Sequence, residues 1–198
     1  MRTRTDLLNH LAEKYNLQMY LEIGVQNPDQ NFNKIKCGAL KTSVDPDPNA
    51  SALHCVTSDE FFSYNKDQFD LIFIDGLHTA EQVKKDFENA LKILSPGGFI
   101  VLHDCNPLKE EHTIVPRPTP TGHWNGDVYK FAMNLKCQKY CVDIDNGCMV
   151  VPHQERINLS EYLIPFTNNE IWRHFSAHRK ELLNLISWDE FIRLNPHL

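Results

Sequence analysis

Apolar residues recur along the first part of the chain at two different spacings. Leu7, Leu11 and Tyr15 follow one another at helical intervals, which predicts a helix over residues 4–16. A short apolar run at residues 19–25 follows and predicts a buried strand. The change from helical to extended spacing then repeats along the chain, which is typical of a protein whose strands and helices alternate.

The same pattern predicts further strands at residues 41–47, 53–58, 70–76 and 98–104. The last two are apolar almost without interruption, which indicates burial on both faces, as in a parallel sheet. A helix is predicted between the strands at 70–76 and 98–104. Thr79 and Gln82 form a capping-box pattern at its start, and residues 95–98 end it. Together these elements favour a doubly wound α/β fold.

The second half of the chain departs from this alternation. Residues 107–126 are rich in proline and glycine, which predicts a long loop, and long loops in compact domains are usually functional or mobile. A helix is predicted over residues 126–136. An Asn-Gly turn at residues 145–147 lies between two β-prone runs and predicts an antiparallel hairpin. The tail from Leu159 onward is expected to be helical.

Composition narrows the class of protein. The chain has 198 residues, 41% of them hydrophobic, which suits one substantial core. The net charge of -6 and the scattered lysines and arginines argue against a nucleic-acid partner. The N-terminus lacks the apolar core of a secretory signal, and no apolar run approaches the roughly 20 residues of a membrane span. Six cysteines without paired spacing indicate free thiols. We therefore expect a cytoplasmic protein with no membrane partner.

Polar residues occur at the ends of the first two predicted strands, where open parallel sheets bind their ligands. Gly24 allows the backbone to turn and approach a ligand. Asp45 lies near the offset of about 20 residues at which an acid holds a ribose diol. The loop after Gly24 lacks the second and third glycines of a dinucleotide-binding fingerprint. A nucleoside ligand is therefore favoured over a nicotinamide dinucleotide.

A second polar group follows the strands at 70–76 and 98–104. If these strands are neighbours, Asp75 and Asp104 lie side by side, and two close carboxylates repel unless a proton or a cation offsets their charge. Asn106 could add a neutral oxygen, which gives an all-oxygen set suited to Mg²⁺, Mn²⁺ or Ca²⁺. His78 is expected to face the same cavity and to act as a general base.

Each of these residues also has a purely structural interpretation. Asp75 could simply end its strand in a turn with the glycine that follows it. Asp104 could form an Asx-type turn before Pro107. His78 could be the residue that enters the helix ahead of the Thr79 cap. The sequence leaves these interpretations open.

Several segments together resemble a class I S-adenosylmethionine-dependent methyltransferase with a Rossmann-like fold. They are LEIGV, VDPD, TSDEFF, FDLIFIDGLHTAEQVKKD and LSPGGFIVLHDCNP. WNGDVYK and DNGCMVV add a resemblance to the branch of sugar and macrolide O-methyltransferases of the macrocin and mycinamicin type. The resemblance covers residues 19–152. It implies a methyltransferase domain over residues 1–153, with a helical extension at 154–198 packed on it.

The resemblance implies a mostly parallel, seven-stranded sheet whose last strand is antiparallel. It also implies which residues contact the cofactor. Glu22 and Gly24 would line the amino-acid end of S-adenosyl-L-methionine, and Asp45 would hold its ribose. Ser58 and Asp59 would lie near the adenine. Side chains in the first loop would replace the missing glycines in binding.

In metal-dependent relatives, acids at the positions of Asp75 and Asp104 bind a divalent ion, and a histidine at the position of His78 serves as base. Asp75 is also expected to contact the cofactor. Relatives often have a second acid where this chain has Cys105. The resemblance therefore leaves the metal set incomplete, or completed by Asn106, by water or by the acceptor itself.

The sequence thus predicts an O-methyltransferase, assisted by Mg or Mn, that acts on a hydroxyl of a sugar, glycan or related small molecule. His78, Trp124 and Asp127 would contact the acceptor, with Trp124 packing against a sugar ring. Self-association into a homo-oligomer is left open. Two alternatives are a cofactor-binding but catalytically inactive regulatory or scaffold domain and an atypical NAD-binding oxidoreductase.

Overall fold

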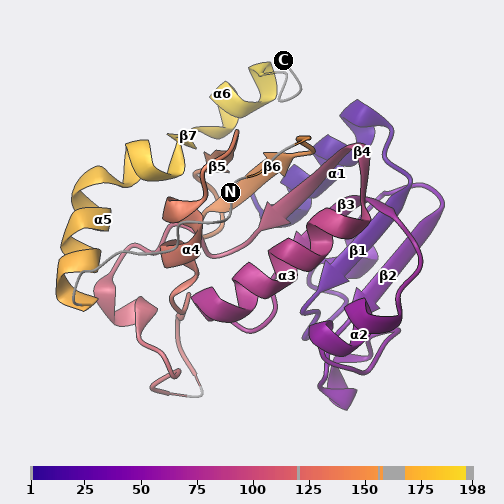
Figure 1. Ribbon diagram of the computed structural model, residues 1–198, viewed down its shortest axis with the longest axis horizontal. Helices are drawn as coiled ribbons and strands as arrows, with labels where there is room; N and C mark the ends of the chain where they lie inside the picture. The colour runs from indigo at the N-terminus through magenta and orange to yellow at the C-terminus, as the bar shows by residue number, and fades with distance from the viewer. Residues whose placement is uncertain (1, 120, 156, 158–167, 195–198) are drawn as a thin grey trace.

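The computed structural model describes all residues except 1, 120, 156, 158–167 and 195–198. In this part of the chain, seven strands form one sheet in the order β2-β1-β3-β4-β6-β5-β7, with helices on both faces (Figure 1). The strands are β1 (Met19–Ile23), β2 (Leu40–Val44), β3 (Phe69–Ile74), β4 (Leu94–Leu102), β5 (Tyr140–Val142), β6 (Cys148–Pro152) and β7 (Leu185–Ile186). The α-helices are α1 (Arg4–Tyr15), α2 (Ser58–Tyr64), α3 (Ala80–Ile93), α4 (Val128–Asn134), α5 (Asn168–Leu183) and α6 (Trp188–Arg193). Single 3-10 turns lie at Phe32–Lys34, Pro48–Ala50 and Glu110–Thr113. The predicted Rossmann-like α/β fold is confirmed.

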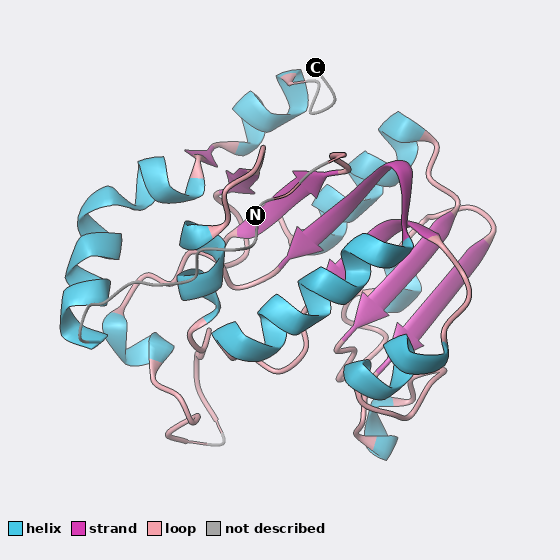
Figure 2. Cartoon of the chain, viewed as in Figure 1, coloured by secondary structure: helices cyan, strands magenta, loops and turns pink. Residues whose placement is uncertain are grey.

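The sheet is parallel except for one strand of the described part. β1 pairs in parallel with β2 and β3, and β3 pairs in parallel with β4. β6 runs antiparallel between β4 and β5. Figure 2 shows the strands from β1 to β4 pointing toward the same edge, with β6 reversed. The predicted hairpin is confirmed, and Asp145, Asn146 and Gly147 all adopt positive φ in its turn.

One of the seven predicted strands, at residues 53–58, is absent, and β7 near the C-terminus completes the sheet instead. The prediction of a strand at residues 53–58 is wrong, since its single sheet contact is an isolated bridge between Val44 and His54. Thr57 accepts a hydrogen bond from the backbone N–H of Glu60, and this cap starts α2 where the strand was expected to end. The C-terminal region instead supplies β7, which pairs in parallel with β5. The part of the predicted tail at residues 158–167 and 195–198 lies outside the described residues.

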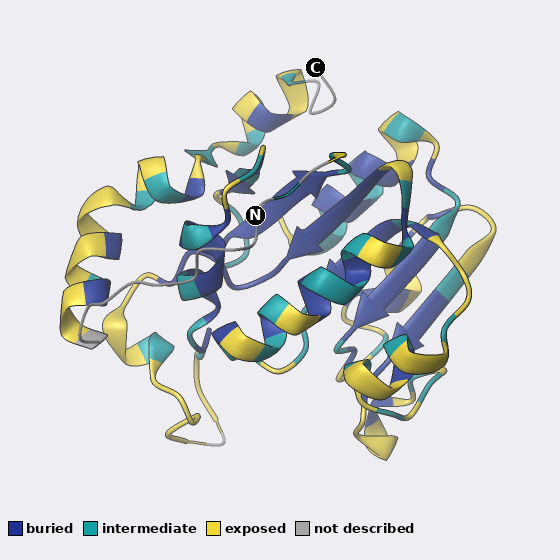
Figure 3. Ribbon diagram, viewed as in Figure 1, coloured by how far each residue is buried: buried dark blue, intermediate teal, exposed yellow. Residues whose placement is uncertain are grey.

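Side chains of the central strands divide between two cores. In β3, Leu71 and Phe73 face the core that α1 covers, while Ile72 and Ile74 face the core under α3. This alternation follows from the two-residue period of a strand and explains why the run is apolar throughout. Figure 3 shows the strands as buried and the outer sides of the helices as exposed.

Local capping fixes the start of the two helices that flank the sheet. Thr3 and Asp6 form a capping box at the beginning of α1, and the Thr79 side chain accepts a hydrogen bond from the backbone N–H of Gln82 at the beginning of α3. These hydrogen bonds fix the residue at which each of the two helices begins. None of the described helices combines the length and apolar character needed to cross a membrane.

Candidate active site

A cavity of ≈ 710 Å³ opens at the carboxyl ends of β1 to β4. The predicted site residues that line it are Gly24, Asp45, Ser58, Asp59, Asp75, His78, Asp104 and Trp124. Because parallel strands end at the same edge, residues that are far apart in the sequence meet here. The structure therefore brings most of the predicted site together, while the role of each residue stays a prediction.

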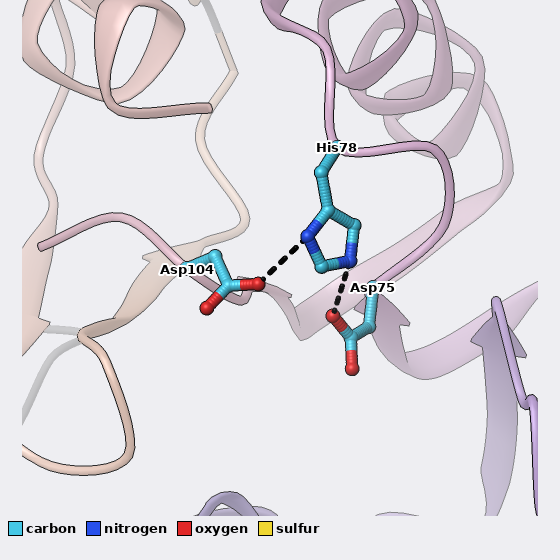
Figure 4. A group of neighbouring side chains, drawn as sticks. All are labelled: Asp75, His78 and Asp104. Carbon is cyan, nitrogen blue, oxygen red and sulfur yellow. Dashed lines mark ion pairs between the residues drawn. The ribbon is translucent and has the colours of Figure 1, made fainter. Parts of the chain in front are cut away.

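His78 lies between the two acids at the centre of this cavity. Its Nδ1 is 3.0 Å from Oδ2 of Asp104, and its Nε2 is 3.5 Å from Oδ1 of Asp75 (Figure 4). One ligand atom from each of the three residues lies within 4.8 Å of the other two. This spacing is compatible with a single cation held by two oxygens and one nitrogen.

The charges of the cluster shift its pKa values. Burial lowers the pKa of His78, but the adjacent carboxylates of Asp104 and Asp75 outweigh burial and raise the pKa to about 9. Burial alone would raise the pKa of Asp75, yet the adjacent His103 and His78 hold it well below its ordinary value. The pKa of Asp104 is lowered for the same reason. Both acids are therefore ionised at neutral pH.

Two residues of the cluster were missed by the sequence analysis. His103 is buried, and its Nδ1 lies 3.0 Å from Oδ1 of Asp75. Arg4 reaches in from the first turn of α1, with Nη1 3.3 Å from Nε2 of His103 and 3.8 Å from Oδ2 of Asp75. His103 precedes Asp104 in the chain, which was a usable signal. Nothing in the local sequence connects Arg4 to this site.

Asp104 is held in an unusual backbone conformation. Its φ is 59°, in the left-handed region that Asp and Asn tolerate better than most residues. Its Oδ1 accepts a hydrogen bond of 2.6 Å from Nδ2 of the fully buried Asn125. The hydrogen bond from Asn125 to Oδ1 thus fixes the carboxylate with its other oxygen, Oδ2, facing His78.

The loop at 107–126 covers the cluster with an aromatic layer. The indole of Trp124 stacks on the His78 ring, and the guanidinium of Arg117 lies 5.4 Å from the centre of the Trp124 ring. Nε1 of Trp124 donates a hydrogen bond of 2.7 Å to the carbonyl of Ile114. Gly126 has φ +63, and a Cβ there would lie 1.8 Å from the His78 carbonyl oxygen, so this close approach requires glycine.

The first loop forms the opposite wall of the cavity. Gly24 has φ +84, and a Cβ at that position would lie 2.2 Å from the carbonyl oxygen of Asp75. Oδ2 of Asp45 accepts hydrogen bonds of 2.9 Å from the backbone N–H groups of Val25 and Gln26. The Asp45 carboxylate therefore stabilises a loop that lacks the usual additional glycines.

Ser58 and Asp59 begin α2 at the far side of the cavity. Nε2 of Gln82 in α3 lies 3.3 Å from Oγ of Ser58 and donates a hydrogen bond of 3.1 Å to Oδ1 of Asp59. Gln82 also lines the cavity. These polar groups come from two helices and form a hydrogen-bonding wall.

Glu22 is not among the residues that line the cavity, and the cofactor contact that the resemblance implies for it stays a prediction. It is buried on the α1 side, where Oε2 accepts hydrogen bonds of 2.5 Å from the Tyr20 hydroxyl and 2.9 Å from Nδ2 of Asn31. Tyr20 lies two residues away on the same face of β1, which explains the contact. Burial raises the pKa of Glu22 to about 7, although the bond from Tyr20 lowers it.

Asn106 and Asp127 also lie away from the cavity wall. The amide of Asn106 donates to Oδ1 of Asp143 at 3.1 Å and accepts from Nη1 of Arg179 at 2.9 Å. Asn106 is therefore engaged with Asp143 and Arg179, and its role as a metal ligand stays a prediction.

Asp127 instead holds the start of α3. Its Oδ1 accepts a hydrogen bond of 2.7 Å from the backbone N–H of Ala80, and its Oδ2 lies 3.1 Å from Nζ of Lys130. Both oxygens thus have partners within the fold, and the contact of Asp127 with the acceptor stays a prediction.

Comparisons with known proteins agree with this geometry. Residues 29–105 match the family model described as a methyltransferase domain. That segment includes Asp45, Asp75, His78 and Asp104. No curated protein matches the chain.

Several solved structures share the fold at low identity. A candidate caffeoyl-CoA O-methyltransferase from Staphylococcus aureus is 18% identical, with 78% of this chain and 84% of that chain covered and a TM-score of 0.54. The N-methyltransferase NodS from Bradyrhizobium japonicum WM9 is 17% identical, with coverages of 76% and 94% and a TM-score of 0.51. Cofactor-bound Rv0187 from MTB is 14% identical, with coverages of 76% and 79% and a TM-score of 0.52.

These likenesses concern the fold, and they include enzymes that methylate either oxygen or nitrogen. They do not single out the macrocin and mycinamicin branch, so that narrower resemblance stays a prediction. The family match extends over the strands that carry the acids and over the start of α3. The prediction that this chain is a methyltransferase, with the seven-stranded fold typical of such enzymes, is confirmed.

Proposed function

We propose that the chain is an S-adenosylmethionine-dependent O-methyltransferase that acts on a hydroxyl of a small molecule with the help of a divalent cation. The observation that carries this proposal is the cluster of Asp75, His78 and Asp104 in the cavity at the strand ends. A nitrogen acceptor with a free lone pair needs no base to become nucleophilic. A hydroxyl does, and the cluster contains a histidine between two acids.

The cavity walls fit S-adenosylmethionine, which supplies a methyl group activated by a positive sulfonium when it is bound. Gly24 leaves space where any side chain would collide with the Asp75 backbone. The Asp45 carboxylate lies at the edge of the cavity and can accept hydrogen bonds from a ribose diol. Ser58 and Asp59 offer polar groups to an adenine. The acidic lining also suits a positively charged ligand.

The cluster also fits a divalent cation, which supplies Lewis acidity to an acceptor oxygen when it is bound. Asp75 and Asp104 would hold it through carboxylate oxygens, which Mg²⁺ and Mn²⁺ prefer. Both acids are ionised, which is the form of a carboxylate that binds a cation, and His78, His103 and Arg4 lie beside them.

His78 is the residue placed to accept the hydroxyl proton. With a pKa of about 9 it is protonated at neutral pH and, together with His103 and Arg4, compensates the two acids. Neutralising Asp75 and Asp104 by another charge removes the cause of that shift and frees the imidazole to accept a proton. Asp104 then orients His78 through its Nδ1.

The acceptor is best sought among sugars, glycans and related hydroxylated molecules. Trp124 lies next to His78, and an indole ring packs well on the C–H surface of a sugar ring, which here would displace Arg117 from the Trp124 ring. The loop at 107–126 would exclude water from the acceptor once it is bound.

The test is methyl transfer from labelled S-adenosylmethionine to a panel of sugars and glycans, with Mg²⁺ or Mn²⁺ and with EDTA. Transfer to a hydroxyl that EDTA abolishes supports the proposal. Binding of S-adenosylhomocysteine without transfer to any acceptor favours an inactive regulatory or scaffold domain. A larger thermal shift with NAD than with S-adenosylhomocysteine would contradict the proposal and favour an oxidoreductase.

A further inference from the structure

Arg4 lines the cavity and has hydrogen-bonding groups with no partner among the described residues. It begins α1, and its side chain is 22% exposed. The polar contacts of its side chain with the described residues all involve Nη1, which approaches His103, Asp75 and Asp145. Within that part of the chain, Nε and Nη2 have no partner. These two groups form the planar fork that binds a carboxylate through two parallel hydrogen bonds.

Most of the charged side chains that line the cavity are acidic, and Arg4 is one of the few basic ones. The acids that line the cavity are Asp45, Asp47, Asp59, Asp75 and Asp104. The arginines and lysines among the lining residues are Arg4 and Arg117 alone. An anionic group on a ligand is repelled by these acids and attracted to positive side chains. Of the positive groups in the wall, His78 and His103 already contact Asp75 and Asp104, which leaves the two arginines.

Position separates the two arginines. Arg117 lies over the Trp124 ring, on the loop that covers His78. Arg4 lies beside Asp75, whose backbone is packed against Gly24 in the first loop. Arg4 is therefore on the cofactor side of the cluster, and Arg117 is on the acceptor side.

The structure also holds Arg4 in place before any ligand binds. Its backbone N–H donates a hydrogen bond of 3.0 Å to Oδ2 of Asp145. The neighbouring Thr5 donates a hydrogen bond of 2.7 Å to Oδ1 of Asn31, which in turn binds the buried Glu22. The first turn of α1 is thus tied to both β1 and the hairpin, which reduces the entropy that Arg4 loses when it binds a ligand.

We propose that Arg4 binds the carboxylate of the methionyl group of S-adenosylmethionine through its Nε–Nη2 edge. The inference rests on the proposed function, because it concerns the same ligand. The methionyl carboxylate is the anionic group of that ligand, and Glu22, expected at this end of the cavity, faces the core instead. Arg4 is then the residue that distinguishes a ligand with this carboxylate from one without it.

The test compares two ligands by calorimetry on the full chain, S-adenosylmethionine and its decarboxylated form. The wild-type protein should prefer S-adenosylmethionine although the decarboxylated ligand carries more positive charge. Arg4→Gln should weaken S-adenosylmethionine binding by roughly 10- to 100-fold, as expected for a charged hydrogen-bonding pair. It should leave the affinity for the decarboxylated ligand within about 3-fold.

Two further variants sharpen the comparison. Arg4→Lys keeps the charge without the fork and should give an intermediate loss. Arg2→Gln removes an arginine that pairs with the exposed Asp6 outside the cavity, so it should leave both affinities unchanged. Thermal melting of each variant confirms that it is folded.

Equal losses for both ligands in Arg4→Gln would overturn the inference, because Arg4 would then act only by supporting Asp75 and His103. A wild-type protein that binds both ligands equally would also overturn it, without any variant. A wild-type protein that binds neither ligand would instead remove the proposed function itself, and the inference with it.

Discussion

The indole ring of Trp124 lies parallel to the imidazole ring of His78, with an interplanar angle of 2° and ring centroids 5.0 Å apart. The stacked indole ring restricts rotation of the His78 ring, which lies between Asp75 and Asp104. Trp124 belongs to the long loop at 107–126, whereas His78 precedes α3. The stack therefore couples the covering loop to the predicted base.

Replacing Trp124 by alanine should impair use of the acceptor more than binding of the cofactor. An aromatic pair contributes about 0.5–1.5 kcal/mol beyond area burial, so we expect the KM of the acceptor to rise by up to roughly 10-fold. Steady-state kinetics and calorimetry with S-adenosylhomocysteine measure the two effects. Trp124→Phe keeps an aromatic face and is the matched control. A Trp124→Ala enzyme with unchanged KM would show that the acceptor does not use this face.

Removing the charge of Asp104 should stop catalysis without preventing cofactor binding. Asparagine is the appropriate replacement, because it tolerates the φ of 59° at this position and keeps the side-chain shape. Loss of the acid that orients His78 should lower kcat by about 10²- to 10⁴-fold. The affinity for S-adenosylhomocysteine should stay within about 3-fold. Full activity of Asp104→Asn would remove both the cation and the oriented base from the mechanism.

Glu22 should make stability depend on pH. Its pKa is raised from 4.5 to about 7 in the folded protein, so between these values the folded state binds the proton more tightly than the unfolded state. The free energy of unfolding contributed by this group is therefore present below pH 4.5 and is lost as the pH rises through 7. The full effect is about 3 kcal/mol.

Glu22→Gln tests this effect by chemical denaturation at several pH values. Glutamine stays neutral and can accept the same hydrogen bonds from Tyr20 and Asn31. The difference in unfolding free energy between variant and wild type should grow in favour of the variant from pH 5 to pH 8. A difference that is constant over this range would mean that Glu22 titrates at its ordinary pKa.

Gly126 should tolerate no side chain, because of its contact with His78 and not only because of its backbone. Gly97 has a similar φ of +78 but open space around it, so it is the matched control. Gly97→Ala should cost about 1–2 kcal/mol, the usual penalty for a Cβ in the left-handed region. Gly126→Ala should cost more, since its Cβ would collide with the His78 carbonyl. Equal losses in denaturation experiments would show that the loop simply moves away.

The centre of the site was predictable because it follows from topology. Parallel strands end at one edge of a sheet, so the acids after β3 and β4 had to meet once those strands were recognised. Asp75 and Asp104 are therefore brought together as expected, with His78 between them.

The remaining residues depend on features that no local pattern carries. Successive residues of a strand point to opposite faces, which would separate His103 from Asp104. The left-handed backbone of Asp104 breaks that alternation and lets both side chains approach Asp75. Arg4 enters only because α1 packs on one particular face of the sheet.

Other differences from the sequence have equally specific causes. Glu22 lies two residues from Tyr20, so both side chains are on the same face of β1, where they form a hydrogen bond. The expected strand at 53–58 yielded to the Thr57 cap of α2. β7 has two residues, which is too short to give a periodic signal.

The hydrogen bond between the Arg4 backbone and Asp145 joins positions 141 residues apart. At synthesis rates of about 5–20 residues per second, roughly 7 to 30 seconds pass on the ribosome between these two residues. During that interval the first turn of α1 has neither the hairpin nor the finished pocket to dock against. Closing so large a loop is entropically costly, so α1, although it is translated before the hairpin, is expected to be among the last of these elements to settle.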